Sequence, residues 1–338
     1  MVALAGQVMQ CRWVMPAILM IFAGSCISGK PKPAPSEMIA VRGGSFVMGD
    51  SQQAAKCVDG VAAYCSPAAL ATMVVQVSNF RIDATEVTNA QYRFCVDKGI
   101  CKEPLYTGPP QLPAYFFESQ YDDYPVVYVT WKMAEAYCDH LGYDLPTEAQ
   151  WEYAARADEQ LSRGSAVQET PRLFPWGNQL AEDCERAHFA GCSADVILPV
   201  AVGKAEGDRS TFGVADLAGN VAEWVQDSFN HYAYCAGEVS PTKNCGDNTQ
   251  CIDNACAATG CKALHCDDPS AALCINRAAG EVVKDPANYF EDGPATAKTY
   301  RGGSYISPRC GLSSAFRYSL AKDQGDAALG FRCAAPAQ

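Results

Sequence analysis

The sequence predicts an α+β fold that is low in regular secondary structure and rich in disulfide bonds. Of the 338 residues, 18 are cysteine, which is far more than a reduced cytosolic enzyme carries. The chain also contains 27 glycines and 20 prolines, which interrupt it at short intervals. No helical pattern runs beyond about a dozen residues. We therefore expect short helices and strands joined by long loops, in one domain over residues 38–338.

Three short helices and one strand can be placed from local signals. Thr88 and Gln91 have the spacing of a helix capping box, and so do Thr147 and Gln150. Thr130 precedes apolar residues at helical spacing and is expected to cap a further helix. Residues 43–49 form an apolar stretch behind two glycines, which predicts a strand after a turn.

The composition restricts the class of partner. There are 38 acidic and 26 basic side chains, which gives a formal net charge of −12. An acidic chain of this kind is a poor ligand for nucleic acid or for an anionic membrane surface. A hydrophobic content of 49% with 19% charged residues also excludes a wholly disordered chain.

The amino terminus resembles an export signal over residues 1–25. Arg12 precedes the apolar residues 13–22, a run too short to span a bilayer comfortably. Small residues then precede Cys26, as in a bacterial lipoprotein signal, which implies a lipidated Cys26. The alternative is an ordinary cleaved signal with an incidental cysteine. Residues 26–37 are proline-rich and extended. We expect an exported protein of the bacterial cell envelope, held to a membrane by a lipid anchor.

Eight short motifs follow one another between residues 38 and 335. They are Gly43–Gly49, Glu86–Tyr92, Pro125–Trp131, Leu145–Arg156, Pro175–Asn178, Asp216–Trp224, Arg301–Ser304 and Gly330–Cys333. In this order they resemble the sulfatase-modifying factor family, whose best-known members are formylglycine-generating enzymes. The resemblance implies a fold related to C-type lectins.

The resemblance also implies where copper would bind. Active members oxidise a cysteine of a target protein to formylglycine with dioxygen and copper held by two cysteine thiolates. Ser307 and Leu312 occupy those two positions in this chain. Cys310 lies between them, either as a displaced copper ligand or as a disulfide partner. We therefore expect no copper, and no residue is assigned a catalytic role.

A calcium site is implied as well. The family loop corresponds to the side chains of Asp216 and Glu223 and the carbonyls of Gly219 and Val221. Oxygen donors of this kind suit calcium. The alternative is a capped turn with solvated carboxylates. Elsewhere, Arg317 and Arg332 could line a cleft, or could pair with buried carboxylates such as Glu148 or Glu152.

The cysteines divide into local pairs and a cluster. Short spacings suggest Cys57–Cys65, Cys95–Cys101 and Cys184–Cys192, while the resemblance implies Cys138–Cys333. Seven further cysteines lie in an acidic insertion at about residues 235–275, whose spacing does not match a zinc site. We interpret the insertion as a disulfide-stapled loop rather than a metal site, with Cys310 as its eighth cysteine.

Two functions remain open. The first is a binding or scaffold module with calcium as a structural ion and an unidentified protein or peptide ligand in the cleft beside Ser307. The second is a formylglycine-generating oxidase that acts through a rearranged copper site around Cys310. The sequence offers no residues for a third, copper-independent enzyme, because it contains no nucleophile elbow and no nucleotide-binding loop.

Overall fold

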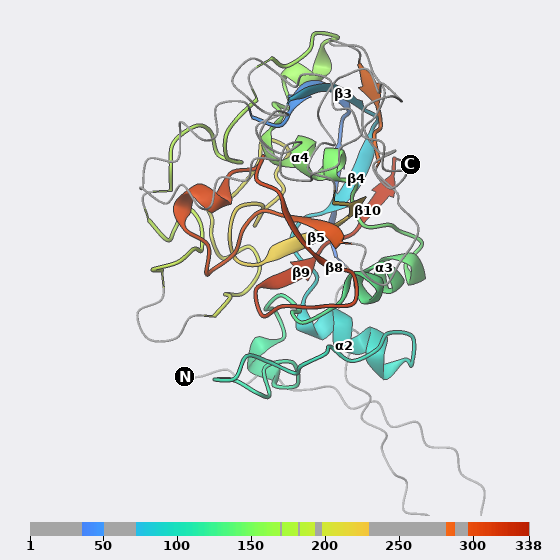
Figure 1. The fold of residues 1–338 in the computed structure, drawn as a ribbon, viewed down its shortest axis with the longest axis vertical. Helices are drawn as coiled ribbons and strands as arrows, with labels where there is room; N and C mark the ends of the chain where they lie inside the picture. The colour runs from blue at the N-terminus through green and yellow to red at the C-terminus, as the bar shows by residue number, and fades with distance from the viewer. Residues whose placement is uncertain are drawn as a thin grey trace, which may run out of the picture. The chain divides into compact units, whose positions relative to one another are not determined.

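The computed structural model describes residues 36–50, 72–169, 171–181, 183–192, 198–229, 282–287 and 297–337 (Figure 1). The predicted signal segment, Cys26, Cys57, Cys65 and the insertion at 235–275 lie outside these ranges. Within them, no helix is both long and apolar enough to cross a membrane.

Three small sheets carry the strands of the described chain. The first has the order β1 (Met38–Val41), β4 (Phe80–Asp83), β10 (Ala334–Pro336), and the second has the order β2 (Gly44–Met48), β3 (Met73–Val77), β6 (Val283–Lys284). The third has the order β8 (Tyr318–Ala321), β7 (Ala297–Arg301), β5 (Ala222–Ser228), β9 (Leu329–Phe331). Strand β5 is antiparallel to β7 and parallel to β9, so the sheet is mixed. This fold agrees with the predicted α+β class.

The three predicted helices are present, and each begins after its expected threonine. They are α2 (Asn89–Asp97), α3 (Trp131–His140) and α4 (Glu148–Arg156). Thr88 and Thr147 form complete capping boxes with Gln91 and Gln150, whereas Thr130 caps α3 through its side chain alone. Short 3-10 turns occur at Ser119–Tyr121, Leu161–Arg163 and Arg309–Leu312. The predicted strand at 43–49 is β2.

Helices α4 and α3 each cover a sheet and form a core with it. Trp151 and Tyr153 of α4 are fully buried, in the same hydrophobic cluster as Phe46 and Val75 of β2 and β3. Around α3, Trp131 is buried with Trp224 of β5 and Phe331 of β9 in a second cluster. The remaining tryptophan of the motifs, Trp176, is only half-buried and stacks on Phe174.

Buried arginines connect these layers. Arg317 binds Glu148, as the sequence suggested, and Arg301 binds Glu152 and Glu148. The expected pairing of Arg332 with Glu148 or Glu152 is wrong, because Arg332 binds Glu223 instead. These side chains are all buried, so the pairs connect β7 and the residues next to β8 and β9 to their neighbours from within the core.

Three of the four expected cysteine pairs lie in the described residues, and all three are bonded. They are Cys95–Cys101, Cys138–Cys333 and Cys184–Cys192. The second pair joins α3 to the chain between β9 and β10 across 195 residues. The fourth pair, Cys57–Cys65, stays a prediction.

Candidate functional site

The loop that follows β7 occupies the place where the resemblance locates copper. Gly302 and Gly303 begin it with positive φ values of 92° and 67°. A Cβ atom on Gly303 would lie 2.6 Å from the carbonyl oxygen of Gly311, so only glycine allows the loop to fold back on itself. This close return brings Ser304, Ser307 and the 3-10 turn at 309–312 together.

Ser307 is half-buried, and its hydroxyl is part of the turn. Ser307 Oγ accepts a hydrogen bond from the Ser304 N–H at 3.0 Å and lies 3.3 Å from Ser304 Oγ. The Ser307 carbonyl accepts from the Ala190 N–H. None of the hydrogen bonds among the described residues links the Ser307 hydroxyl to a histidine or carboxylate base. A hydroxyl without such a base is a weak nucleophile.

Leu312 and Cys310 are both buried beneath this loop. Leu312 is completely shielded from solvent and packs in a cluster with Leu173, Phe174 and Phe189. Cys310 is 5% exposed and is not bonded to any cysteine of the described ranges. Its expected partners in the insertion lie outside those ranges. One hydroxyl, one alkyl side chain and one buried thiol do not form the pair of soft ligands that Cu(I) requires.

A pocket of about 290 Å³ opens beside Ser307. Its wall includes Tyr300, Ser304, Ile306, Ser307, Tyr318 and Asp326. The rings of Tyr300 and Tyr318 stack with their centroids 5.1 Å apart. Among the described residues that line this pocket, Asp326 is the one with a charged side chain. The pocket can therefore accept hydroxyl, amide, aromatic or cationic groups, and it disfavours anions.

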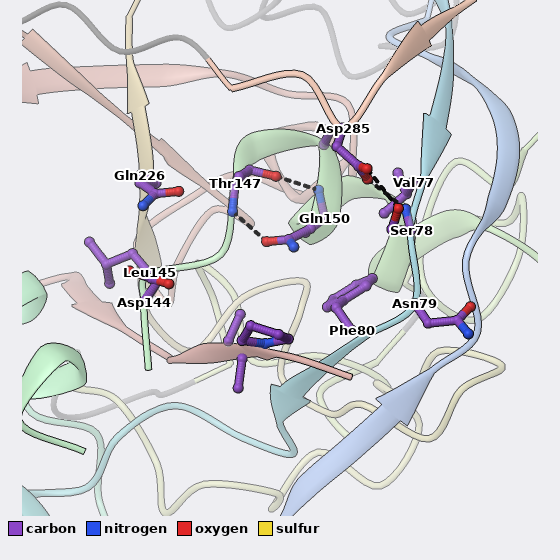
Figure 2. Close-up of a pocket in the computed structure, with 14 residues that line it drawn as sticks. Val77, Ser78, Asn79, Phe80, Asp144, Leu145, Thr147, Gln150, Gln226 and Asp285 are labelled. Carbon is purple, nitrogen blue, oxygen red and sulfur yellow. Dashed lines mark hydrogen bonds between the residues drawn. The ribbon is translucent and has the colours of Figure 1, made fainter. Parts of the chain in front are cut away.

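A second pocket, of about 260 Å³, lies between α4 and the first two sheets (Figure 2). In Figure 2, Asp285 binds the N–H and the hydroxyl of Ser78 at one side, and Gln226 lies at the opposite side. The hydrogen bonds of the capping box between Thr147 and Gln150 lie in its wall. Most of its polar atoms are therefore used within the protein.

In the loop expected to bind calcium, only part of the expected ligand set is suited to a cation. Asp216, Gly219 and Asn220 all have positive φ values. A Cβ atom on Gly219 would lie 2.4 Å from the His188 carbonyl oxygen, so this position requires glycine. The Asn220 carbonyl accepts from the Tyr305 N–H. Among the described residues, no hydrogen bond reaches the carbonyls of Gly219 and Val221. These two oxygens therefore fit the expected ligand set.

Glu223 does not fit that set. Its Oε1 accepts from Arg332 Nη2 at 2.6 Å, and its Oε2 accepts from Arg332 Nε at 2.6 Å and from Trp151 Nε1 at 2.8 Å. The bidentate guanidinium neutralises this carboxylate. No group of three or more His, Cys, Asp or Glu side chains in the described ranges is arranged to hold a metal ion.

Glu223 and Asp216 are instead part of a larger buried group of acidic side chains. Asp83, Glu86, Asp208, Asp216 and Glu223 are each at most 2% exposed. Burial raises the pKa of Asp83 to about 7. Burial and then the charge of Asp216 raise the pKa values of Glu86 and Asp208 well above the usual range. Burial also raises the pKa of Asp216, which the Gly203 N–H partly offsets. The one buried guanidinium that the described residues place among them is that of Arg332.

The sequence predicted Asp216 and Glu223 but missed Glu86 and Asp208 as neighbours of the same loop. Glu86 lies within one of the eight motifs, and its position in that motif could have marked it as a candidate site residue. Asp208 lies in a polar loop, and no local pattern distinguishes it there. Their shared environment arises only from folding, since Glu86 and Asn220 are 134 residues apart and are hydrogen-bonded at 3.0 Å.

Comparison with known structures first defines the class of fold. PvdO from Pseudomonas aeruginosa superposes with a TM-score of 0.52 and 20% sequence identity, over 89% of this chain and 95% of that chain. This likeness shows a common loop-rich α+β fold. A family profile described as "Sulfatase-modifying factor enzyme 1-like domain" matches residues 25–337. The chain therefore belongs to the sulfatase-modifying factor family, of the formylglycine-generating-enzyme type.

Curated relatives in this family have different activities. The chain is 27% identical over 264 residues to the formylglycine-generating enzyme of Bos taurus, covering 64% of this chain and 64% of that protein. It is 29% identical over 222 residues to the hercynine oxygenase of Mycolicibacterium smegmatis, covering 58% of this chain and 46% of that protein. The match thus spans less than two thirds of either relative. Family membership alone therefore does not assign an activity.

Proposed function

We propose that this protein is an exported, lipid-anchored binding module of the bacterial cell envelope, with calcium as a structural ion and without the copper oxidase activity of its relatives. The observation that carries the proposal is which residues, Ser307 and Leu312, stand at the two positions where the resemblance places the copper ligands. Ser307 contributes a hydroxyl that the turn already uses, and Leu312 is buried in a hydrophobic cluster. The loop keeps its glycine-based fold, so the cleft persists while the thiolate pair is missing.

The pocket beside Ser307 supports a peptide ligand that carries a basic side chain. Asp326 accepts the Ala328 N–H through one oxygen and is itself exposed, so its charge is available at the mouth of the pocket. The stacked rings of Tyr300 and Tyr318 offer aromatic surface next to it. A guanidinium or ammonium group gains from both a carboxylate and aromatic rings.

The alternative, an oxidase with a rearranged site, rests on Cys310. The decisive assay incubates the copper-reconstituted protein with oxygen and a peptide containing Cys-x-Pro-x-Arg, and measures aldehyde by mass spectrometry. We expect none, in wild type and in Cys310→Ser alike. Aldehyde formation in wild type that disappears in Cys310→Ser would establish the oxidase and overturn the proposal.

The binding role has its own test. Calorimetric titration compares the same peptide with a variant peptide in which glutamate replaces arginine. We expect the arginine peptide to bind more tightly, and Asp326→Asn to remove the difference. Asp323→Asn is the matched control, because Asp323 is exposed on the same loop and does not line the pocket. Equal binding of both peptides to wild type would argue against the basic ligand.

Lipid anchoring is tested separately. Expression of the full chain in a bacterial host fed a labelled fatty acid should label the wild type and leave Cys26→Ser unlabelled. An unlabelled wild type recovered in soluble form would point to an ordinary cleaved signal instead.

A further inference from the structure

The pocket between α4 and the first two sheets, called the α4 pocket below, has walls that are held in place by internal bonds (Figure 2). Asp285 accepts from the N–H and the hydroxyl of Ser78 at 2.6 and 2.7 Å, and its own N–H donates to the Gln76 carbonyl. Asp285 has a φ of 43°, a left-handed conformation that costs free energy for a residue with a Cβ atom, and these bonds hold it there. The capping box of Thr147 and Gln150 fixes the wall formed by α4. A ligand would therefore meet a pocket that is already formed, which favours binding.

The α4 pocket is apolar inside and polar at its mouth. The buried residues that line it all have apolar side chains, and they are Val77, Phe80, Leu145, Ala149, Ala334 and Ala335. The polar residues of the lining are exposed or half-buried. The volume of about 260 Å³ lies just below the range of about 300–1,000 Å³ that is typical of sites for drug-sized ligands. The pocket therefore suits a small ligand, about one ring in size, with an apolar face and a polar edge.

Three side chains of the lining keep polar groups that are not hydrogen-bonded to any described residue. They are the carboxylate of Asp144, the carboxamide of Gln226 and the Nδ2 group of Asn79, whose Oδ1 accepts from the Gly43 N–H at 2.9 Å. In Figure 2, Asp144 and Gln226 lie at one side of the pocket and Asn79 lies at the other. Donors and acceptors are thus available at both sides of a ligand.

The charge and the hydrogen-bonding groups of the lining restrict the class of ligand. The described residues that line the α4 pocket include two carboxylates, Asp144 and Asp285, and no lysine, arginine or histidine. An anion is therefore repelled. A guanidinium or ammonium group would satisfy Asp144 but accepts no hydrogen bond, so the amide donors of Asn79 and Gln226 would gain nothing. A hydroxyl group both donates and accepts, and it can pair with the carboxylate and with both amides.

We propose that the α4 pocket binds a neutral saccharide unit. Asp144 and Gln226 bind hydroxyl groups at one edge of the sugar ring, and Asn79 donates to a hydroxyl oxygen at the other. The C–H groups of the ring pack against the apolar interior that includes Phe80 and Leu145. This site shares no lining residue with the pocket beside Ser307. It does not depend on whether that second pocket binds a peptide or oxidises a cysteine.

The test measures binding of small glycosides to the full-length protein by saturation-transfer NMR. The neutral probes are the methyl glycosides of glucose, galactose, mannose and N-acetylglucosamine, and the charged probes are the methyl glycosides of glucosamine and glucuronic acid. We expect at least one neutral glycoside to bind with a dissociation constant of the order of 1–10 mM, as suits a ligand of one ring. The glucuronide should bind at least about threefold more weakly than that glycoside, because its carboxylate is repelled by Asp144.

Two variants assign the binding to this pocket. Asp144→Ala and Gln226→Ala should each weaken binding of the neutral glycoside by about threefold or more, because each removes a hydrogen-bonding partner at the edge of the ring. Asp139→Ala is the matched control, since Asp139 is exposed nearby in sequence and does not line the pocket. Melting temperatures check that all three variants are folded.

Several results would overturn the inference. One is a wild-type protein that binds none of the neutral glycosides at about 50 mM. A second is tighter binding of the glucosamine derivative than of every neutral probe, which would make the pocket a cation site. A third is binding that persists unchanged in both Asp144→Ala and Gln226→Ala. A fourth is displacement of the sugar by the arginine peptide, which would place the sugar beside Ser307.

Discussion

In the described part of the chain, Arg332 is the buried cation that lies among five buried carboxyl groups, and its removal should be among the most damaging single changes to this protein. Its side chain is fully buried, and its guanidinium makes five hydrogen bonds. Two go to Glu223, and the others go to the backbone carbonyls of Asp83, Ala215 and Asp216. It therefore ties the segment between β9 and β10 to β4, to β5 and to the loop before β5.

The expected cost of Arg332→Gln follows from these contacts. Removing one partner of a buried ion pair costs about 3–5 kcal/mol, because the other charge is left uncompensated. This is a large part of the ~5–15 kcal/mol by which a domain is stable. With a urea slope of about 2 kcal/mol per molar, the midpoint should fall by roughly 2 M at pH 8. At pH 5 the loss should be smaller, because Glu223 can then take up a proton at little cost.

The assay is urea unfolding of the oxidised protein, followed by tryptophan fluorescence at both pH values. Arg163→Gln is the control: Arg163 also pairs with a glutamate, Glu159, but the two side chains are 66% and 38% exposed. Its removal should cost less than about 0.5 kcal/mol. A midpoint shift for Arg332→Gln below about 0.5 M at pH 8, or an equal shift at both pH values, would refute the reasoning.

Three further predictions concern stability. Thr147→Ala removes the side-chain cap of α4 and should cost about 1 kcal/mol by urea unfolding, whereas Thr147→Ser should cost less. Reduction of Cys138–Cys333, or its replacement by two serines, should cost about 4 kcal/mol, since the bond closes a long loop; a change in melting temperature no larger than that for Cys95–Cys101 would contradict this. The native pKa of Asp83 is about 7, above the usual value of 3.8, so the folded state holds the extra proton between these values. Its contribution to the free energy of unfolding should therefore fall as the pH rises from about 4 to 7 and level off above, and Asp83→Asn should reduce this pH dependence. An unchanged pH profile in Asp83→Asn would contradict the assignment.

The parts of the fold that depend on neighbouring residues were predictable. Each helix begins at a threonine that caps it, because a capping box needs only a side chain and a backbone N–H three residues apart. The pairs Cys95–Cys101 and Cys184–Cys192 are also local. The long-range pair Cys138–Cys333 was available only through resemblance to a family.

That positions 307 and 312, where the resemblance places the copper ligands, are not cysteines could likewise be read from the sequence. The structure shows what these residues do instead: Ser307 has a hydroxyl bound within a turn, and Leu312 is packed in a hydrophobic cluster. The folded chain also forms the pocket beside Ser307, which has one carboxylate, that of Asp326, in its lining.

The buried charges, in contrast, were decided by the tertiary structure. The sequence suggested Glu148 or Glu152 for Arg332, yet Arg332 binds Glu223, and Glu86 binds Asn220 from a distant part of the chain. Local patterns cannot determine these contacts, since the partner of a buried charge is the one that the packing of strands and loops brings within hydrogen-bonding distance. The family, the helix starts and the lack of cysteine at positions 307 and 312 follow from the amino-acid sequence alone. Folding decided which buried carboxylate the Arg332 guanidinium neutralises, because it brings Glu223 within hydrogen-bonding distance of that side chain.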